Sequence, residues 1–509
     1  MKYLDYLLSV KEKGTQGRLG IIFKTKNNFY LFDAGTNKVA IIDEPQGLEF
    51  LSMFFNDAIT VEKFKSYVDA HATDNTIYSF LKKMEEENLL QAHEVTSLQL
   101  LPPGESYEDR VDNHSELIIL ELTGKCNFRC KYCIYSEEFD ENRNFNNEDM
   151  TWKTARKAID YACTHNKNAL SITFYGGEPL IKFDLMKKSI DYALDTWSGK
   201  RELSFSFTSN LSLLTEDMAE YFASVPNLSV TASIDGPKDI HDAFRVYANN
   251  KPTFHDTLRG LECIAKAFKN TRNSLMINAV YTPPYSYERT KRIGDFFASL
   301  PYLKDIEILI SYPSPNTLHN IDKMFEDGEE KYATNFEIGN PLARWAWDNY
   351  INGSGNPMAV QYMFDRLKTA HFRMLLNAPV NHYHLNGNCT PGVRRLYVKT
   401  NGDFAICEKI GNSPVIGNVD EGIDVSKVKQ YYIKEYEAAS LPECSKCWAV
   451  NMCDLCYANC YSTNGINMVE KRKMCEVTRT NVLISLSMYY TLLEEHPEKL
   501  EFFKDATFT

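Results

Sequence analysis

The sequence predicts an α/β fold: a partial (β/α)6 parallel barrel with an N-terminal winged-helix-like domain and a C-terminal cysteine-rich, cluster-binding domain. Three observations predict it. Apolar runs of strand length alternate with segments of helix length between residues 116 and 310. A group of β-rich runs and helical patterns precedes them, and most of the 13 cysteines lie after residue 388. The length of 509 residues is also that of about three domains.

The N-terminal domain is predicted at residues 1–95. Between residues 20 and 43, three β-rich runs are broken by Asn27-Asn28 and by Ala34-Gly35-Thr36-Asn37, which are typical turn residues. Helical spacings of apolar residues follow, so we expect a β-meander joined to helices, as in a winged-helix-like unit. Residues 96–115 contain Pro102-Pro103-Gly104 and several charges, which predicts a linker.

The central region, residues 116–310, is predicted to be the barrel. Because parallel strands end on the same edge of a sheet, the loops after its apolar runs are expected to carry the chemistry. Residues 311–387 are mainly helical in pattern and are interpreted as a bridge. A cluster-binding domain at residues 388–480 and a C-terminal helix at residues 481–509 complete the chain. The strand-length runs of the barrel lie at residues 116–123, 169–175, 204–209, 228–235, 275–281 and 305–311.

Composition and charge argue against several functions. The chain holds 56 Lys and Arg against 68 Asp and Glu, a formal charge of −12, so nucleic acid is not an expected partner. The first residues, MKYLDYLLSVKEKG, are too charged for a signal peptide, and no segment approaches the roughly 18 apolar residues of a membrane helix. We therefore expect a cytoplasmic protein with no membrane partner, in which the 13 cysteines have metal or redox roles.

Cys126, Cys130 and Cys133 form a tight triplet, CNFRCKYC, directly after the first apolar run of the barrel. Three thiolates can hold three irons of a four-iron cluster and leave the fourth iron open to an exogenous chelating group. The alternative is a zinc knuckle, but zinc prefers four closed ligands and no nearby fourth Cys or His suits it. The triplet thus favours an iron–sulfur cluster.

The spacing C-x3-C-x2-C, with Tyr132 before the last cysteine, resembles the signature of the radical S-adenosylmethionine (AdoMet) superfamily. Gly176-Gly177-Glu178-Pro179, Thr208-Ser209-Asn210 and the run SIDGPKDIHDAFR resemble loops that hold AdoMet in that superfamily. Taken singly, each polar group would serve equally well to cap the next helix. The resemblance implies AdoMet contacts at Tyr132, Gly176, Gly177, Glu178, Pro179, Ser209, Asn210, Ser233, Asp235 and Arg245.

The chemistry of the superfamily is implied by this resemblance alone. An electron from the cluster cleaves AdoMet, and the resulting 5′-deoxyadenosyl radical removes a hydrogen atom from an unactivated carbon. Such an enzyme needs an electron donor such as flavodoxin or ferredoxin. No catalytic acid or base is assigned from the sequence.

The C-terminal cysteines resemble the SPASM extension of radical AdoMet enzymes, whose two auxiliary [4Fe-4S] clusters would bring the total to three. The run CDLCYANC departs from the usual spacing C-x3-C, so the first of these clusters has either Cys456 or no protein group as its fourth ligand. We favour the open case, because Cys456 forms a second C-x2-C with Cys453 and could instead point into the core. An open iron could then bind a substrate cysteine as thiolate. A zinc ribbon is the alternative for this region, and Cys163 and Cys263 are expected to be core residues. By order along the chain, one cluster takes Cys444, Cys447, Cys453 and Cys475, and the other takes Cys389, Cys407 and Cys460.

The N-terminal unit resembles the leader-recognition elements of maturases that modify ribosomally made peptides, which bind the peptide as an added strand. A packing or dimerisation domain is the alternative. The leading hypothesis is a maturase that forms thioether crosslinks in a cysteine-containing precursor peptide with a leader, as sactipeptide and ranthipeptide maturases do. A second hypothesis is a related enzyme that forms carbon–carbon crosslinks or formylglycine. A third is a non-catalytic, zinc-dependent peptide-binding protein.

Overall fold

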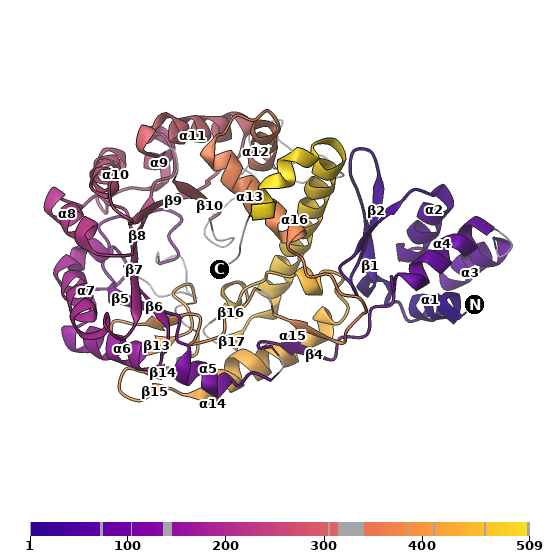
Figure 1. The fold of residues 1–509 in the computed structure, drawn as a ribbon, viewed down its shortest axis with the longest axis horizontal. Coiled ribbons are helices and arrows are strands. Elements are labelled where there is room, and N and C mark those ends of the chain that lie inside the picture. The colour runs from indigo at the N-terminus through magenta and orange to yellow at the C-terminus, as the bar shows by residue number, and fades with distance from the viewer. Residues whose placement is uncertain are drawn as a thin grey trace.

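The computed structural model describes residues 2–71, 75–102, 104–135, 145–303, 306–313, 340–385, 387–410, 413–462 and 465–505. In Figure 1 the N-terminal unit lies at one end of the molecule and a curved sheet covered by helices lies at the other. The long helix α16 (Met468–Glu495) runs between them. In the described part of the chain, no helix has the length and apolar character needed to cross a membrane.

The N-terminal unit contains the predicted meander. Its three strands pair antiparallel in chain order, and Asn37 takes a left-handed φ of 58° in the second turn, a conformation that asparagine tolerates. Phe50, Phe54 and Phe64 from two of its helices are fully buried in its core. The elements are α1 (Lys2–Glu12), β1 (Gly20–Lys24), β2 (Phe29–Asp33), β3 (Val39–Ile42), α2 (Pro45–Phe55), α3 (Val61–Ala70) and α4 (Asn75–Glu86).

The segment 96–115, predicted to be a linker, is instead ordered against the rest of the protein. Strand β4 (Ser97–Gln99) pairs parallel with β11 (His382–His384), and helix α5 (Tyr107–Asn113) follows. Leu98 is buried in a small apolar cluster, and the Tyr107 hydroxyl donates a hydrogen bond to the Pro391 carbonyl at 2.5 Å. The prediction was wrong because a three-residue strand among prolines and charges has no period of its own, and its partners lie far along the chain.

The barrel strands are those predicted, within about two residues at each end. They pair in parallel in chain order, and helices cover the outer face of the curved sheet. The strands are β5 (Leu117–Thr123), β6 (Ala169–Gly176), β7 (Glu202–Ser209), β8 (Leu228–Ser233), β9 (Ser274–Val280) and β10 (Glu307–Ser311). The helices are α6 (Trp152–Thr164), α7 (Phe183–Trp197), α8 (Glu216–Ser224), α9 (Lys238–Phe244), α10 (Phe254–Phe268) and α11 (Tyr287–Ser299).

The sheet continues past β5 into the cysteine-rich domain, which the sequence did not predict. Strand β12 (Leu396–Val398) pairs parallel with β5, and β13 (Asp403–Ala405), β14 (Gly417–Asn418) and β15 (Gly422–Ile423) add antiparallel strands. These strands have two or three residues each, too few for a period-two pattern. One sheet of 10 strands therefore joins the barrel to the cysteine-rich domain.

The bridge contains helices α12 (Pro341–Ile351) and α13 (Pro357–His371), as its pattern predicts; residues 314–339 lie outside the described residues. The C-terminal helix begins earlier than predicted. It starts at Met468, where Asn467 caps it by accepting hydrogen bonds from two backbone N–H groups, so Cys475 is a helical residue. The remaining elements are α14 (Val425–Val428), a π-helical turn (Lys429–Lys434), α15 (Glu435–Cys444), β16 (Tyr461–Ser462) and β17 (Gly465–Ile466).

The N-terminal unit packs on the cysteine-rich domain. Phe32 in β2 contacts Trp448, and both lie in one buried apolar cluster with residues of α16. At the tip of the β1–β2 hairpin, the Glu494 carboxylate accepts hydrogen bonds from Thr25 at 2.8 Å and Tyr30 at 2.6 Å. The unit is therefore fixed against the loop that carries Cys447 and Cys453.

Candidate active site

A cavity of about 250 Å³ lies where barrel strands β6 to β10 end. All three cysteines of the first triplet line it, together with most of the residues predicted to contact AdoMet. Pro179 and Asp235 do not line it: Pro179 begins a buried 3₁₀ turn (Pro179–Lys182), and Asp235 lies behind the wall. The predicted residues that line the cavity are Cys126, Cys130, Tyr132, Cys133, Gly176, Gly177, Glu178, Ser209, Asn210, Ser233 and Arg245.

Two glycines bring the end of β6 against the cysteine loop. A side chain at Gly176, whose φ is +146°, would meet the Thr123 carbonyl oxygen at 2.4 Å. A side chain at Gly177 would meet the Lys125 carbonyl oxygen at 2.1 Å and the Cys126 backbone nitrogen at 2.9 Å. Only glycine permits this approach, so the Gly-Gly pair sets the cysteine loop beside the next strand.

The Glu178 carboxylate is buried and joins the ends of two strands. It accepts hydrogen bonds from the Ser209 hydroxyl at 2.7 Å, from the Asn210 backbone N–H at 2.9 Å and from the Leu180 backbone N–H at 3.0 Å. Burial raises the pKa of Glu178, and these donors oppose that rise. The Glu178 side chain thus links the end of β6 to the end of β7 through hydrogen bonds within the protein and stabilises this wall of the cavity.

Asp235 organises a buried charged group behind the cavity. Its carboxylate accepts a hydrogen bond from the Tyr132 hydroxyl at 2.6 Å and another from the Val280 backbone N–H at 3.0 Å. Arg245 Nε lies 3.0 Å from Asp235 Oδ2, and Arg245 Nη1 lies 3.9 Å from Cys130 Sγ. Burial lowers the pKa of Arg245, but Asp235 outweighs it and raises that pKa, so the guanidinium stays charged. A cation is thereby placed beside one cysteine of the triplet.

The cysteine triplet fits the proposed cluster. Burial raises the pKa of Cys130 to about 12, and it also raises the pKa of Cys126, so these thiols are weak acids without a metal. Metal binding would release their protons. Three thiols facing one cavity, with free volume beside them, match three protein ligands and an exogenous chelate. In the described part of the chain, no group of three or more His, Cys, Asp or Glu side chains is arranged to hold a single metal ion.

Sequence reasoning missed several lining residues. Asn278 and Val280 come from the end of β9, and Tyr312 follows β10. Active-site residues of parallel barrels lie in the loops that follow the strands, so these two loops were expected to contribute. Neither loop carries a recognisable motif, and the individual residues were therefore not predicted. Tyr135 and Phe145 also line the cavity and flank residues outside the described set.

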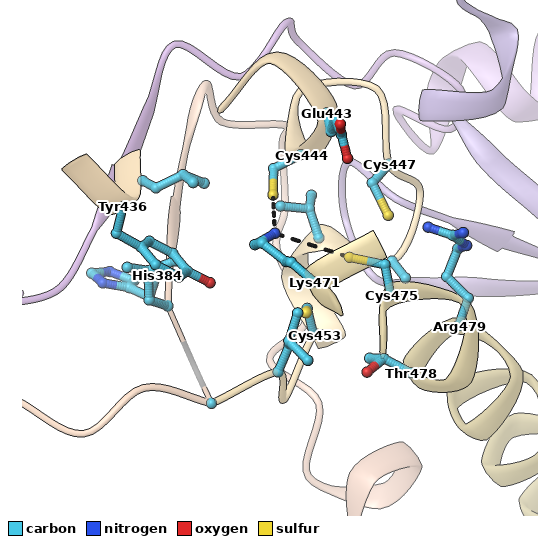
Figure 2. A pocket seen from close by; sticks show the side chains of 16 residues that line it. His384, Tyr436, Glu443, Cys444, Cys447, Cys453, Lys471, Cys475, Thr478 and Arg479 are labelled. Atoms are coloured by element: carbon cyan, nitrogen blue, oxygen red, sulfur yellow. Dashed lines mark hydrogen bonds between the residues drawn. The ribbon is translucent and has the colours of Figure 1, made fainter. Parts of the chain in front are cut away.

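The second auxiliary group, Cys444, Cys447, Cys453 and Cys475, lines one pocket at the start of α16 (Figure 2). Cys444 ends α15, Cys447 and Cys453 flank a short 3₁₀ turn (Val450–Met452), and Cys475 comes from α16. Burial raises the pKa of Cys453 to about 12. The structure thus brings together the four cysteines predicted to share one cluster.

The first auxiliary group was predicted to contain Cys389, Cys407 and Cys460, with Cys456 left open as a fourth ligand. Burial raises the pKa of Cys389, Arg395 lowers it, and a Cys456 thiolate raises it again. Cys460 is only 1% exposed, and its Sγ lies 3.4 Å from the Cys456 carbonyl oxygen. Burial raises the pKa of Cys460, Lys471 lowers it, and thiolates at Cys456, Cys475 and Cys453 raise it further. Cys456 is therefore electrostatically coupled to both Cys389 and Cys460, and the ligand set of the first auxiliary group stays a prediction.

Cys407 lies directly after β13, beside charged side chains. Its Sγ is 3.2 Å from Glu408 Oε2, and Arg395 Nη1 donates a hydrogen bond to Glu408 Oε1 at 2.8 Å. Tyr135, which lines the cavity of the cysteine triplet, donates a hydrogen bond to the Glu408 carbonyl oxygen at 3.1 Å. The chain next to Cys407 is therefore tied to the wall of this cavity.

Two cysteines lie apart from all three groups. Cys163 is fully buried in α6, and Cys263 packs against the barrel core from α10. Both were predicted to be core residues; Cys163 is one, whereas Cys263 is only partly buried at the edge of the core.

Comparison with known proteins identifies the class. Residues 120–297 match the profile of the radical SAM superfamily, a span that runs from β5 into α11 and contains the cysteine triplet. The chain therefore carries a radical SAM domain, and the enzyme class predicted from the triplet is confirmed. This match favours an enzyme over the non-catalytic zinc-binding hypothesis.

Several curated proteins are similar in sequence. An uncharacterised protein of Methanocaldococcus jannaschii is 39% identical over 144 residues, which are 28% of this chain and 46% of that protein. The radical SAM cyclopropyl synthase TigE of Paramaledivibacter caminithermalis is 26% identical over 232 residues, 42% of this chain and 45% of that protein. The chain thus spans less than half the length of each of these two relatives. A cysteine-type anaerobic sulfatase-maturating enzyme of Clostridium novyi is 23% identical over 348 residues, 68% of this chain and 87% of that protein.

Solved structures confirm the fold. Native anSMEcpe with bound AdoMet superposes with a TM-score of 0.54 at 18% identity, covering 74% of this chain and 99% of that chain. Native anSMEcpe with bound AdoMet and the Cp18Cys peptide gives a TM-score of 0.51 at 17% identity, covering 77% and 99%. The predicted α/β class with a parallel, partial barrel and a cysteine-rich C-terminal region is therefore confirmed.

Proposed function

We propose that this radical SAM enzyme forms thioether crosslinks from cysteine sulfur to carbon in a ribosomally made precursor peptide. The observation that carries the proposal is the Tyr135–Glu408 hydrogen bond at 3.1 Å, because it ties the residue next to Cys407 to the wall of the cavity that holds the cysteine triplet. A peptide in the cavity would then have one residue near the radical site and its cysteine near Cys389, Cys407 and Cys456. The curated relatives and solved neighbours that modify or bind peptides support this substrate class.

The proposed ligand sets follow from the placement of the thiols. The triplet would hold the radical SAM cluster, and Cys444, Cys447, Cys453 and Cys475 would hold one auxiliary cluster. Cys389, Cys407 and Cys456 would hold the other. All 13 cysteines lie in the described part of the chain, and after these assignments the buried Cys163 and Cys460 and the partly buried Cys263 remain. The last cluster would thus have an open position for the substrate cysteine, as an incomplete ligand set provides.

When bound, AdoMet and the three clusters would supply a radical that takes a hydrogen atom from a substrate carbon, and an acceptor for the electron released as the sulfur–carbon bond forms. The residues of the chain would bind AdoMet and orient it in the cavity. The Gly176-Gly177 backbone, Ser209, Asn210 and Ser233 would contact AdoMet from the cavity wall. Tyr132 and Arg245, fixed by Asp235, would close the far side and exclude water.

The N-terminal unit would recognise the leader of the peptide, by addition of a strand to its meander. The packing of this unit directly on the loop of Cys447 and Cys453 supports the proposal, since a bound leader would then lie beside the cysteine-rich domain. Reducing equivalents would come from a protein such as flavodoxin or ferredoxin.

The second candidate is a sulfatase-maturase-like enzyme that forms formylglycine, or an enzyme that forms a carbon–carbon crosslink. The similarity to the Clostridium novyi enzyme over 87% of its length favours it equally on sequence grounds. A thioether differs from these products because its cysteine sulfur gains a second bond to carbon, to a carbon atom of another residue.

Mass spectrometry separates the candidates. The anaerobically reconstituted enzyme is incubated with a reductant, AdoMet and the precursor peptide encoded beside its gene. A thioether removes two hydrogens per crosslink and leaves its cysteine resistant to alkylation. A loss of two hydrogens with the cysteine still open to alkylation indicates a carbon–carbon bond, and conversion of the cysteine to an aldehyde indicates formylglycine. Either of the last two results overturns the thioether proposal.

A further inference from the structure

Lys471 reaches into the second auxiliary group. It stands one helical turn before Cys475 on α16, and its Nζ lies 3.7 Å from Cys444 Sγ and 3.9 Å from Cys475 Sγ. Figure 2 shows the amino group between these two sulfurs, with Cys447 and Cys453 on either side. The Tyr436 ring lies on another side, 5.7 Å from the amino group.

The Lys471 side chain is buried without a carboxylate partner. The residue is 2% exposed, and none of the ion pairs found among the described residues includes it. Glu443, the carboxylate that lines the same pocket, pairs instead with Arg472 at 2.7 Å. Burying an ammonium group without an anion carries a large desolvation penalty and lowers the stability of the folded protein. Its position is therefore explained best if the sulfur ligands themselves supply the negative charge.

An iron–sulfur cluster would supply that charge. A [4Fe-4S] cluster with four thiolate ligands is anionic, and its reduction adds one more negative charge. The potential of such clusters responds to net charge and to hydrogen bonds to sulfur. A cation in contact with the ligand sulfurs stabilises the reduced form more than the oxidised form, because the reduced form carries more negative charge. It therefore raises the reduction potential.

We propose that Lys471 is a positioning residue that neutralises the auxiliary cluster held by Cys444, Cys447, Cys453 and Cys475 and raises its reduction potential. The inference rests on the proposed assignment of that cluster. It makes this site a better electron acceptor than an all-cysteine site without a neighbouring cation. The thiols supply the iron ligands, and Lys471 supplies charge and a hydrogen-bond donor without binding iron.

The test compares substitutions that separate charge from shape. Lys471→Met removes the charge, Lys471→Gln keeps a donor without the charge, and Lys471→Arg keeps both. Lys473→Met is the control, because Lys473 lies on the same helix but is 62% exposed and pairs with Glu470. Each change is made in a background in which Cys126, Cys130 and Cys133 are alanine, so that only the auxiliary clusters are observed. Iron and sulfide are counted first, and the clusters are then titrated against potential by electron paramagnetic resonance.

The Met and Gln variants are expected to keep their iron and to show a lower potential for one cluster. At a fixed potential, the ratio of reduced to oxidised cluster should fall on the order of tenfold, equal to about 59 mV for a one-electron couple. The Arg and control variants should match the parent. Loss of iron from the Met and Gln variants but not from the Arg variant would also support the charge pairing. Unchanged potentials in Met and Gln, or equal loss of iron from all three variants, would overturn it. A parent without two auxiliary clusters would instead contradict the proposed function.

Discussion

Arg245 and Asp235 form an ion pair in which the two side chains are 7% and 0% exposed, with 3.0 Å between Nε and Oδ2. Asp235→Asn would leave the guanidinium buried without its anion. We expect this change to destabilise the barrel by about 3–5 kcal/mol, the usual cost of breaking a buried pair from one side. Thermal unfolding followed by circular dichroism measures the loss.

A matched control is available on the surface. Asp239 pairs with Arg292 at 2.7 Å, and these side chains are 61% and 53% exposed. Asp239→Asn should cost no more than about 1 kcal/mol, because exposed pairs are solvated and screened. Equal effects of the two substitutions would show that the buried pair has no special role in stability.

Asp149 ties the cysteine loop to the loop after β6. Its Oδ2 lies 2.8 Å from Lys125 Nζ and 3.3 Å from Lys182 Nζ. Burial raises the pKa of Asp149, but hydrogen bonds from Lys125, Thr123 and Lys182 outweigh it and lower the pKa from 3.8 to about 2. Since the folded-state pKa is depressed, the stabilisation is fully present above the unfolded value and is lost as the pH falls from about 4 to 2.

Asp149→Asn should therefore reduce the free energy of unfolding by about 2 kcal/mol at pH 7, and by clearly less at pH 3. Urea unfolding of the parent and the variant at the two pH values measures both differences. Asp295→Asn, at a pair with Lys291 in which the aspartate is 59% exposed, is the control and should change little at either pH. A difference between parent and Asp149→Asn that does not shrink at low pH would contradict the assignment.

Substitutions of Cys456 and Cys460 are expected to have opposite effects on iron content. Cys456→Ser should remove the iron of one auxiliary cluster, because Cys456 is proposed to hold that cluster together with Cys389 and Cys407. Cys460→Ser should leave the iron content unchanged, since Cys460 lies in the core with its thiol against backbone carbonyl groups. Iron and acid-labile sulfide per chain decide between them. Loss of iron only in the Cys460 variant would restore the assignment made from order along the chain.

The choice between Cys456 and Cys460 shows where sequence reasoning is weakest. Spacing alone treats the two cysteines as interchangeable. In the structure a 3₁₀ turn (Tyr457–Asn459) separates them, Cys460 is buried and Cys456 is partly exposed, and no sequence period encodes that turn. The antiparallel meander and the barrel strands were predictable, because turn residues and long apolar runs leave strong patterns. Strands β4 and β11 to β15 were not, since each is short and stabilised by distant partners.

The cavity that Cys126, Cys130 and Cys133 line was predictable for a different reason. Gly176-Gly177 and the cysteine triplet carry motifs, and the parallel order of strands brings their loops together. Tyr135 and Tyr312 carry none, and only the fold reveals that they line the same space.

Deleting residues 1–95 should separate recognition from radical chemistry. We expect processing of a leader-bearing peptide to fall at least about tenfold, equal to about 1.4 kcal/mol, while 5′-deoxyadenosine still forms without peptide. The deletion also uncovers Trp448 and Met452, so some loss of iron from the second auxiliary group is expected. Peptide affinity measured by fluorescence anisotropy checks the first point. Undiminished affinity would make the unit a packing domain.

The central claim is that AdoMet is cleaved at the site of Cys126, Cys130 and Cys133, apart from the auxiliary clusters. The most direct measurement is 5′-deoxyadenosine formed by the reduced, reconstituted enzyme and by the variant in which all three cysteines are alanine. The account predicts that the variant forms none while keeping the iron of the auxiliary clusters. Formation of 5′-deoxyadenosine by the variant at the rate of the parent would contradict it.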